Sequence, residues 1–354
     1  MGTAVDYIIV GQGLAGSALA WELVMRGRSV AVYDEPLMNR ASTISAGICN
    51  PITGKGMVKS YKADELFPFL ARFYGHAERK LSHKFFYPLP VYRPFISNEE
   101  MRQWKDKVAS GVLRNFISKV CDKPTFSGEI NDPHGGLQIL QSGYLNVPDW
   151  ISSIRNMLVQ MNCYHQEHFS EEELIVEDTI RYRGYTASKI IFCNGLGLTQ
   201  SAWFDWLPLR PLKGETLTVR VDIAPDQIIS RGVYLVPSGK DGTFIVGSTY
   251  QHAPFTQGPT EQGRSQLETR LRSLIRPAFT TIHQDWGIRP TVTDRRPLMG
   301  SHPANNNVII FNGLGTKGVS LAPYFARCLA DWMDQGVALP EEVNIFRFKS
   351  LYSR

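Results

Sequence analysis

The N-terminal part of the chain places a segment of helical spacing between two apolar runs. Tyr7–Val10 is a short apolar run that ends at glycines, which is typical of a buried parallel strand. Residues 14–26 then carry apolar side chains at helical spacing, and Gly27 follows them at the position of a C-cap. The next apolar run, SVAVYD, ends at Asp34. Together these segments predict one β-α-β unit of about 30 residues.

Two later parts of the chain repeat the pattern of an apolar run that ends at glycine. Residues 179–193 predict a hairpin that leads into a buried strand, Ile190–Cys193. Near the C-terminus, the run NVIIFN predicts a strand, and the glycine loop Gly313–Gly318 follows it. Val319–Met333 has the spacing of an amphipathic helix. Both ends of the chain therefore contribute strands and helices of an α/β type.

The middle of the chain has a different pattern. Residues 207–250 alternate between apolar and polar positions, which predicts an antiparallel sheet. Helical spacing predicts helices over Asp64–Lys80, Glu99–Ser110 and Gln262–Ile275. We therefore expect an α/β fold (α+β overall), in which an antiparallel-sheet domain is inserted into a Rossmann-like dinucleotide-binding domain. The expected boundaries are 1–86, 137–206 and 285–354 for the dinucleotide-binding domain, and 87–136 and 207–284 for the inserted domain.

Composition narrows the class of protein. The net charge of +5 is mild, and without a concentrated Lys/Arg block it does not by itself indicate nucleic-acid binding. The five cysteines are far apart with no CxxC pair, so we expect reduced thiols and a cytoplasmic protein. We see no signal peptide and no apolar run of membrane-spanning length. His165 and His168 have helical spacing but lack a third ligand in sequence, so we expect no metal site.

The strongest local motif is the glycine cluster of the first β-α-β unit. Gly11, Gly13 and Gly16 form GxGxxG, and Asp34 follows about 20 residues later, where an acid can bind a ribose hydroxyl. Gly11 permits a tight turn, Gly13 admits the pyrophosphate, and Gly16 allows close packing of helix and strand. The helix N-terminus offers N–H groups to the phosphates. The acid disfavours NADP, but the motif does not separate NAD from FAD.

Seven blocks in order resemble the D-amino acid oxidase superfamily of FAD enzymes, which includes glycine oxidase, sarcosine oxidase and D-amino acid dehydrogenase. They are the GxGxxG unit, ASTISAGI, GYLNVPDW, KIIFCNGLG, YLVPSGKDGTFIVGST, WGIRPTVTDRRPLMG and NGLGTKGVSLAP. The resemblance implies FAD as cofactor, with the dinucleotide-binding domain holding it and the inserted domain binding substrate. Because Thr291–Asp294 contains no cysteine where sarcosine oxidases attach their flavin, we expect noncovalent FAD.

The resemblance also implies which residues hold the cofactor. Gly313–Gly318 would contact the flavin, and the following helix N-terminus would favour a ring that becomes anionic on reduction. We expect the Lys317 side chain to be solvated, although it could add charge at the flavin. Glycine oxidases carry arginine in place of Thr316, so their substrate specificity is not carried over to this chain. Further expected cofactor contacts are Leu14, Ala15, Glu35, Ser42, Thr43, Ala46, Gly47, Phe169, Asn194, Gly195, Leu314 and Gly315.

Two residues are candidates for catalysis. Arg289, in GIRP, matches the family arginine that binds a substrate carboxylate, for which a planar fork of donors is suited. Tyr234 matches a family tyrosine that contacts substrate. The competing interpretations are a structural ion pair for Arg289 and a strand aromatic for Tyr234. The implied reaction transfers the α-hydride of an amine or amino acid to flavin N5, releases an imine, and uses O2 or a quinone as the electron acceptor.

Two other functions stay open. The phrases LFPFLARFY, WGIRPTVTDRRPLMG and GLGTKGVSLAP also resemble the oxidase half of a bifunctional enzyme that removes a carboxymethyl group from wobble uridine in tRNA. We do not favour tRNA as the substrate, because the charge balance is not diagnostic. A non-catalytic flavoprotein is the third possibility. The substrate, the choice between oxidase and dehydrogenase, and the oligomeric state do not follow from the sequence.

Overall fold

The computed structural model describes residues 2–35, 40–53, 58–126, 128–240 and 242–352. The chain forms two compact units that are both discontinuous in sequence. Unit 1 consists of Met1–Thr43, Val147–Leu212 and Ile288–Arg354, and unit 2 consists of Ile44–Asn146 and Lys213–Gly287. Residues 44–86 and 137–146, which the sequence boundaries assigned to the dinucleotide-binding domain, lie in unit 2. Their strands β3 (Ile48–Cys49), β6 (Phe86–Tyr87) and β10 (Gly143–Leu145) form a separate sheet, in which β10 pairs with both β3 and β6.

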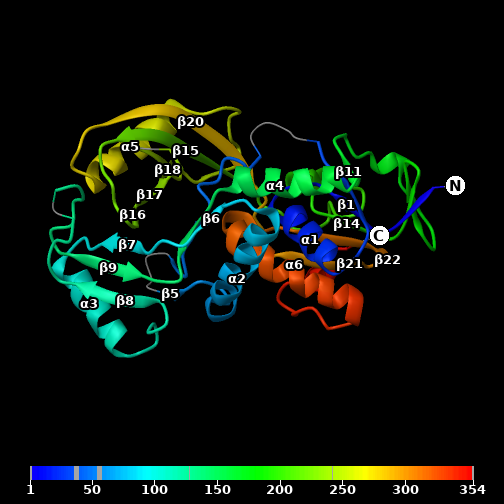
Figure 1. Ribbon diagram of the computed structural model, residues 1–354, viewed down its shortest axis with the longest axis horizontal. Helices are drawn as coiled ribbons and strands as arrows, with labels where there is room; N and C mark the ends of the chain where they lie inside the picture. The colour runs from blue at the N-terminus through cyan, green and yellow to red at the C-terminus, as the bar shows by residue number, and fades with distance from the viewer. Residues whose placement is uncertain (1, 36–39, 54–57, 127, 241, 353–354) are drawn as a thin grey trace. The chain divides into compact units, whose positions relative to one another are not determined.

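Unit 1 is built on a mixed sheet that contains the expected parallel strands (Figure 1). Neighbouring parallel strands run in the order β11-β2-β1-β14-β22, and short antiparallel strands extend the sheet. The bounds of these parallel strands are β11 (Tyr164–His165), β2 (Val30–Tyr33), β1 (Thr3–Val10), β14 (Tyr185–Phe192) and β22 (Asn305–Asn312). The antiparallel additions are β12 (Ile175–Val176), β13 (Ile180–Tyr182) and β21 (Leu298–His302). The expected hairpin before the second buried strand is β13–β14.

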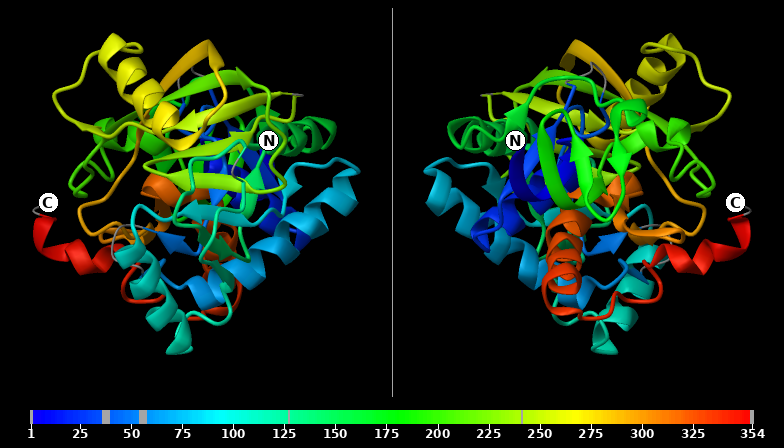
Figure 2. Two further views of the ribbon diagram at one scale, coloured as in Figure 1. Left: turned by 90° about the vertical axis from the view of Figure 1, so that its left-hand side faces the viewer. Right: turned by 90° about the vertical axis from the view of Figure 1, so that its right-hand side faces the viewer.

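Three helices accompany this sheet: α1 (Leu14–Met25), α4 (Val147–Gln160) and α6 (Gly318–Gln335). Helix α1 is buried along most of its length, because it packs against both α4 and α6. Trp21 of α1 meets Trp150 of α4 edge to face, with ring centroids 6.4 Å apart. Shorter helical turns are η1 (Glu171–Glu173), η2 (Gly195–Gln200), η3 (Gly315–Lys317) and η4 (Ile345–Leu351). The last, red beside the C label in Figure 2, packs against β21.

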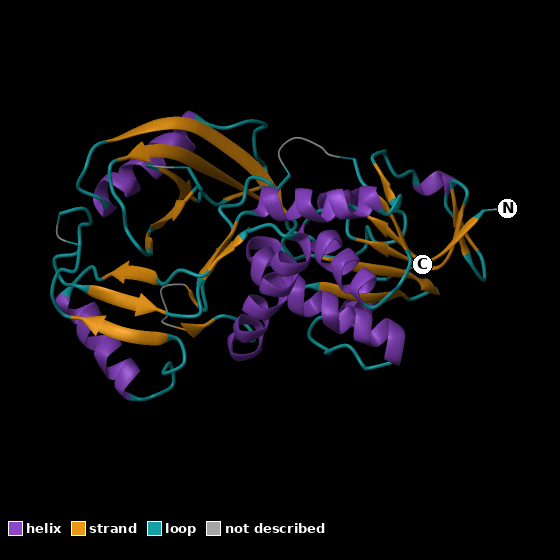
Figure 3. Ribbon diagram, in the orientation of Figure 1, coloured by secondary structure: helices purple, strands orange, loops and turns teal. Residues whose placement is uncertain are grey.

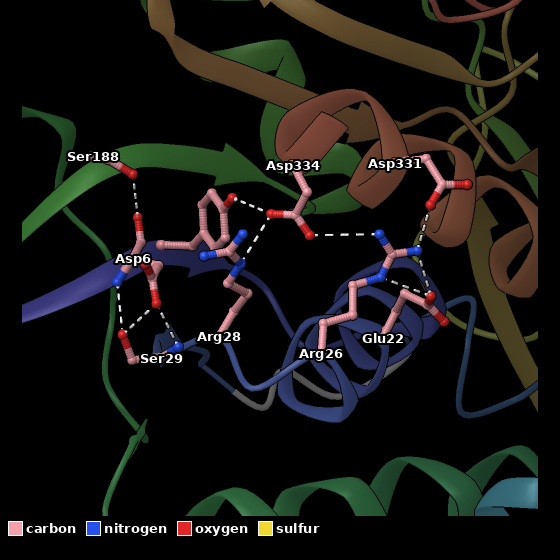
Figure 4. A network of polar contacts seen from close by, with 9 residues as sticks. Asp6, Glu22, Arg26, Arg28, Ser29, Ser188, Asp331 and Asp334 are labelled. Atoms are coloured by element: carbon pink, nitrogen blue, oxygen red, sulfur yellow. Dashed lines mark hydrogen bonds and ion pairs between the residues drawn. The ribbon is translucent and has the colours of Figure 1, made fainter. Parts of the chain in front are cut away.

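An ion-pair network joins the C-terminal ends of α1 and α6 (Figure 4). The Arg26 guanidinium lies 2.7 Å from the Asp331 carboxylate, and Arg28 lies 3.0 Å from Asp334. The Tyr7 hydroxyl donates a hydrogen bond of 3.1 Å to Asp334. Burial and the Asp334 carboxylate raise the pKa of Tyr7 to about 12, which keeps this donor protonated. The network fixes the two helices against each other and against β1.

Unit 2 contains a mostly antiparallel sheet, which also includes a parallel pair of strands, together with helices (Figure 3). The sheet runs in the order β19-β15-β18-β17-β16-β7-β9-β8, with β20 paired to β15. The bounds are β7 (Val91–Pro94), β8 (Ile117–Cys121), β9 (Gly136–Ile139), β15 (Leu212–Val221), β16 (Ile228–Arg231), β17 (Val233–Pro237), β18 (Thr243–Gly247), β19 (Gln251–His252) and β20 (Phe279–Arg289). Strands β4 (Ile52–Thr53) and β5 (Val58–Lys59) form a separate hairpin, and the helices are α2 (Ala63–Leu81), α3 (Asn98–Ala109) and α5 (Glu261–Leu274).

The core of unit 2 lies between α5 and the sheet. Leu217, Val246 and Leu235 are cross-strand neighbours on β15, β18 and β17, and they pack with Leu267 and Leu271 of α5. The period of two in the strands therefore buries one face of the sheet under α5. The mixed architecture confirms the expected fold class.

The structure also bears on the cysteines, on membrane spans and on metal binding. All five cysteines are free. Among the described residues, none of the helices combines the length and hydropathy that a membrane span needs. Within the same ranges, no group of three or more His, Cys, Asp or Glu side chains is arranged to bind a metal ion.

A buried ion pair lies where β15, α5 and β20 meet in unit 2. The Lys213 ammonium and the Glu215 carboxylate are 3.1 Å apart, and both side chains are almost fully buried. Lys213 also donates to the Gly258 carbonyl, and Glu215 accepts from both Thr260 and Gln284. Both charges are thus paired and hydrogen-bonded, which is the condition under which a buried pair is tolerated.

Replacing Lys213 by methionine should destabilise the protein by about 3–5 kcal/mol, because the Glu215 carboxylate would stay buried without its cation. Urea unfolding followed by circular dichroism measures this loss. The matched control is Lys59→Met, which breaks the partly exposed pair with Asp64 and should cost less than about 1 kcal/mol. Equal losses in the two variants would contradict a structural role for the buried pair.

Candidate functional site

The C-terminal ends of the parallel strands of unit 1 bring several predicted residues to one edge of the sheet. Gly11 follows β1, Asp34 follows β2, Asn194 lies just beyond β14, and Gly313 follows β22. The pairing of Val10 with both Tyr33 and Phe192 places the ends of β2 and β14 on either side of β1. Open α/β sheets bind ligands at this edge, and the glycine clusters converge there.

Close backbone approach explains two glycines of the GxGxxG motif. Gly11 has φ +91°, and a Cβ there would lie 2.8 Å from the Cys193 carbonyl oxygen. A Cβ on Gly16 would lie 1.9 Å from the Gly11 carbonyl oxygen. Neither position therefore accepts another side chain without movement of the backbone. The turn and the helix–strand packing are those that the motif predicts.

The N-terminal ends of α1 and α6 lie side by side at this edge. A Cβ on Gly318 would lie 2.9 Å from the Leu14 side chain, while Arg26 and Asp331 join the helices near their other ends. The two helices therefore run parallel. Neither has a side-chain cap or an acidic residue in its first turn. Their N–H groups and positive dipole ends suit an anionic ligand.

The segment after β2 approaches the start of α1. The Ser42 hydroxyl accepts a hydrogen bond of 3.3 Å from the Leu14 N–H and lies 3.1 Å from the Cβ position of Gly13. Thr43 donates from both its N–H and its hydroxyl to the Arg40 carbonyl. Ala15, the next predicted contact, is buried within α1. The structure thus brings Ser42 to the glycine turn, as the cofactor prediction requires, while Thr43 holds the local turn.

Asp34 is buried and surrounded by donors. Its carboxylate accepts from the Gln12 N–H at 2.7 Å and from the Tyr164 hydroxyl at 3.3 Å. Arg40 approaches both carboxylate oxygens at 2.9 Å, and Arg155 lies 3.8 Å away. Burial and the Asp34 carboxylate raise the pKa of Tyr164 to about 12, so its hydroxyl stays protonated and can donate. The acid at the predicted ribose position is therefore rigidly held.

Asn312 links two of the glycine loops. Its side-chain amide donates to the Asn194 side-chain oxygen at 3.3 Å and to the Gly195 carbonyl at 3.0 Å. Its own side-chain oxygen accepts from the Gly313 N–H at 2.8 Å. Asn312 is buried, so these bonds form away from water. The loops after β14 and β22 are consequently tied together.

The segment that carries Arg289 is attached to the loop Gly313–Gly318. Arg289 is the last residue of β20, and the next carbonyl, that of Pro290, accepts from the Gly315 N–H at 3.2 Å. The Thr291 hydroxyl oxygen is buried and lacks a hydrogen-bond partner among the described residues, and it lies 3.6 Å from the Cβ position of Gly315. A ligand at the loop could satisfy this hydroxyl. Arg289 and the predicted flavin loop are thus neighbours in unit 1.

The Lys317 side chain is less exposed to solvent than the sequence suggested. It is only partly exposed, and burial together with the positive charges of Arg296 and Arg295 lowers its pKa. The Lys317 side chain is therefore half-buried rather than fully solvated as expected from sequence, and burial removes part of its water. Thr316 is exposed, whereas Leu314 is buried at the start of the loop.

A cluster of aromatic side chains lies around β2, β13 and β14. Phe169 contacts Tyr182 at a ring distance of 4.3 Å and Tyr33 at 6.2 Å. His165 stacks on Tyr33 at 4.6 Å, and burial lowers its pKa. Exposed Glu35 pairs with exposed His168 at 2.9 Å. These contacts place Phe169 in a packed cluster and Glu35 on the surface. The predicted contacts of Phe169 and Glu35 with the cofactor stay predictions.

Three predicted residues belong to unit 2. Ala46 is buried, and Gly47 has φ +69° with its Cβ position only 1.8 Å from the Leu145 carbonyl oxygen. Tyr234 pairs with Gly247 across β17 and β18, and a Cβ on Gly247 would lie 2.4 Å from the Tyr234 hydroxyl. Tyr234 alternates with buried Leu235, so its ring lies on the face of the sheet away from α5. Their contacts with cofactor or substrate stay predictions.

Sequence reasoning missed several residues of the site. Gln12 is fully buried, and its side chain donates to Ser17 and to the Ile151 carbonyl and accepts from Arg155. Arg40, Arg155, Tyr164 and Asn312 were also missed. Arg155 and Tyr164 lie more than a hundred positions from Asp34 in sequence and carry no motif. Gln12, inside the GxGxxG motif, and Asn312, directly before the glycine loop, had a local signal.

The residues present fit a dinucleotide with a pyrophosphate. Gly11 and Gly16 leave no side chain in the turn, two helix N-termini adjoin whose N-cap residues make no side-chain hydrogen bond, and a buried acid lies at the end of the second strand. Gly11, Gly13, Leu14, Ser42 and Asp34 would hold its nucleotide half. The loop from Gly313 to Gly318 would hold the other half.

Comparisons with known proteins agree with this arrangement. The model of the family DAO, FAD dependent oxidoreductase, matches residues 6–332. The chain is 23% identical to a glycine oxidase of Pseudomonas putida, over 92% of this chain and 93% of that protein. It is 24% identical to a tRNA 5-methylaminomethyl-2-thiouridine biosynthesis bifunctional protein of Marinobacter nauticus, over 92% of this chain and 54% of that protein. The chain therefore spans about half the length of such bifunctional relatives.

The fold is also known from solved structures. The crystal structure of glycine oxidase from Geobacillus kaustophilus superposes with a TM-score of 0.79 at 19% identity, covering 99% of both chains. The resemblance to the D-amino acid oxidase superfamily is confirmed. The chain belongs to the FAD-dependent oxidoreductase family DAO, and it is an enzyme that uses FAD.

Proposed function

We propose that this enzyme oxidises the C–N bond of an amino acid or N-substituted amino acid whose carboxylate binds Arg289. The observation that carries the proposal is the attachment of the Arg289 segment to the loop Gly313–Gly318 through the Pro290–Gly315 hydrogen bond. The resemblance implies this loop as a flavin contact. A carboxylate on Arg289 would therefore lie close to the loop, within the same unit.

The local chain supports Arg289 in this role. The Thr291 N–H donates to the Arg289 carbonyl at 2.9 Å, and the Arg210 N–H donates to the Thr291 carbonyl at 2.6 Å. An arginine on a fixed backbone can present its planar fork to a carboxylate with little loss of freedom. The glycine oxidase of Pseudomonas putida is a relative whose name gives an amino acid as substrate, which favours the same class here.

The reaction needs orientation more than acid–base groups. Bound FAD supplies the acceptor of the α-hydride. Arg289 would fix the carboxylate and hence the α-carbon next to it. The N-terminus of α6 and the charges of Lys317, Arg295 and Arg296 would favour negative charge at the loop. The resulting imine would leave, and O2 or a quinone would accept the electrons.

The two units would have different roles. In this proposal unit 1, with its two helix N-termini, is the FAD-binding domain, and unit 2 is the substrate domain. Tyr234 would contribute a substrate contact from the face of its sheet that α5 leaves uncovered. FAD would be held without a covalent bond, because Thr291–Asp294 contains no cysteine.

The proposal is tested by anaerobic reduction of the bound flavin. Glycine, other amino acids and N-methyl amino acids are each added to the yellow holoenzyme, and flavin absorbance is followed. At least one carboxylated amine should bleach the flavin, while the matching amine without a carboxylate should not. Bleaching by dithionite alone would overturn the proposal, as would equal rates with and without the carboxylate.

Arg289→Ala should raise the KM of the carboxylated substrate about 100-fold, because a truncated charge pair in a binding site costs several kcal/mol. FAD content should stay unchanged. Steady-state kinetics and flavin absorbance measure both quantities. The matched control is Arg327→Ala, which removes an exposed arginine of α6 in the same unit and should leave the KM unchanged. An unaltered KM in the Arg289 variant would remove this residue from the substrate site.

A second candidate function is oxidation of a modified tRNA. The observation that favours it is the similarity to the bifunctional tRNA-biosynthesis protein of Marinobacter nauticus over 92% of this chain. Such a substrate would also be a secondary amine with an adjacent carboxylate, so Arg289 would have the same role. A tRNA substrate differs from a small amino acid because the enzyme would also need a surface that binds nucleic acid.

If tRNA is the substrate, its affinity should fall steeply with salt, since phosphate contacts release counterions. Binding of carboxymethylaminomethyl-modified tRNA is measured between about 50 and 200 mM salt, where several phosphate contacts predict a loss of at least about 100-fold. Unmodified tRNA serves as the control for flavin reduction. Salt-independent or undetectable binding would exclude this candidate and leave the small amino acid.

A further inference from the structure

Arg40 connects the buried acid at the end of β2 with the strand end that carries Arg289. Its guanidinium approaches both Asp34 oxygens at 2.9 Å, one with Nη1 and one with Nη2. A third contact, to the Glu35 carbonyl, uses the same guanidinium. This forked geometry is the strongest and most directional type of ion pair between side chains.

The backbone of Arg40 makes a separate connection. Arg40 forms an isolated parallel β-bridge with Ile288, the residue directly before Arg289. Its carbonyl accepts from Thr43, and Ser42 accepts from Leu14 at the start of α1. One short segment therefore contacts the acid, the glycine turn and the residue beside Arg289, all within unit 1.

We propose that Arg40 is a positioning residue that couples the nucleotide half of the FAD site to carboxylate binding at Arg289. The inference rests on the proposed role of Arg289. Asp34 fixes the Arg40 side chain, and the Arg40 backbone in turn fixes Ile288. Loss of the fork would loosen the segment 40–43 and, through its bridge to Ile288, shift the approach of Arg289 to its ligand.

Asp34 is a suitable anchor for this connection. Its carboxylate is almost fully buried and is already held by the Gln12 N–H and the Tyr164 hydroxyl. The bridge between Arg40 and Ile288 is isolated on the Arg40 side among the described residues, whereas Ile288 belongs to β20, which pairs with β15. The side-chain fork of Arg40 adds a constraint from Asp34 to the Arg40 side of this bridge.

Arg155 supplies a control within the same cluster. Its guanidinium also approaches Asp34, at 3.8 Å, and lies 5.4 Å from the Tyr164 ring centroid. It belongs to α4 and makes no backbone bridge to the segment before Arg289. A charge effect on Asp34 should appear in variants of both arginines, whereas the positioning effect should appear only in variants of Arg40.

The experiment compares Arg40→Met, Arg40→Lys and Arg155→Met as holoenzymes with excess FAD. Acetate is the carboxylate probe, and its Kd is read from the change it causes in the visible spectrum of the bound flavin. Arg40→Met should raise this Kd about tenfold, because small displacements of a binding group have large effects. Arg40→Lys, which keeps the charge but lacks the fork, should give an intermediate value. Arg155→Met should raise this Kd less than Arg40→Met does, because Arg155 makes no bridge to Ile288.

A second measurement does not depend on carboxylate binding. Hydrogen–deuterium exchange of the peptide over residues 284–292 should be faster in Arg40→Met than in wild type and Arg155→Met. Unchanged exchange in Arg40→Met would overturn the inference, and so would an equal rise of the acetate Kd in Arg155→Met. If acetate leaves the wild-type spectrum unaltered, the proposed carboxylate site fails, and the exchange result alone decides whether Arg40 anchors this strand.

Discussion

The parallel packing of α1 and α6 is the constraint on which the rest of the site depends. Arg26 and Arg28 bind Asp331 and Asp334 at one end of the pair, and Gly318 meets Leu14 at the other. Because the helices run in the same direction, their positive dipole ends add at one edge of the sheet. The chain thereby concentrates N–H donors where the proposed FAD site would take the negative charge of the cofactor, using residues from near its two ends.

Buried polar side chains hold the loops around this pair. Asn312 ties the loop after β14 to the loop after β22, and Gln12 ties the glycine turn to α4. Asp34 is held by donors from three separate elements. Each group has its hydrogen bonds supplied by the protein, so the site is organised by its own contacts. Such preorganisation suits an enzyme whose chemistry comes from its cofactor.

Much of the fold and part of the site could be predicted. Strong periodicity identified α1, α2, α5 and the strands β1, β2, β14, β22 and β15 to β18 to within a few residues. Gly11 and Gly16 were predictable because their spacing encodes a close approach of backbone to backbone. The partial burial of the Lys317 side chain was not predictable, because burial depends on the tertiary surroundings of η3. The contacts of the fold group residues 44–86 with unit 2, whereas the sequence boundaries placed them with the dinucleotide-binding domain; β3 and β6 are too short to show a pattern and form only by pairing with β10.

The sequence by itself determined the local geometry: the glycine turn, the helix starts and the alternation that buries one face of each sheet. These features depend on neighbours within a few positions, so the order of residues is enough to specify them. Only the tertiary structure decided that Arg40, Arg155 and Tyr164 surround Asp34, and that the Arg289 segment adjoins the loop Gly313–Gly318. Such contacts join positions far apart in the chain, and their energy comes from desolvation and geometry that exist only once the sheet has assembled.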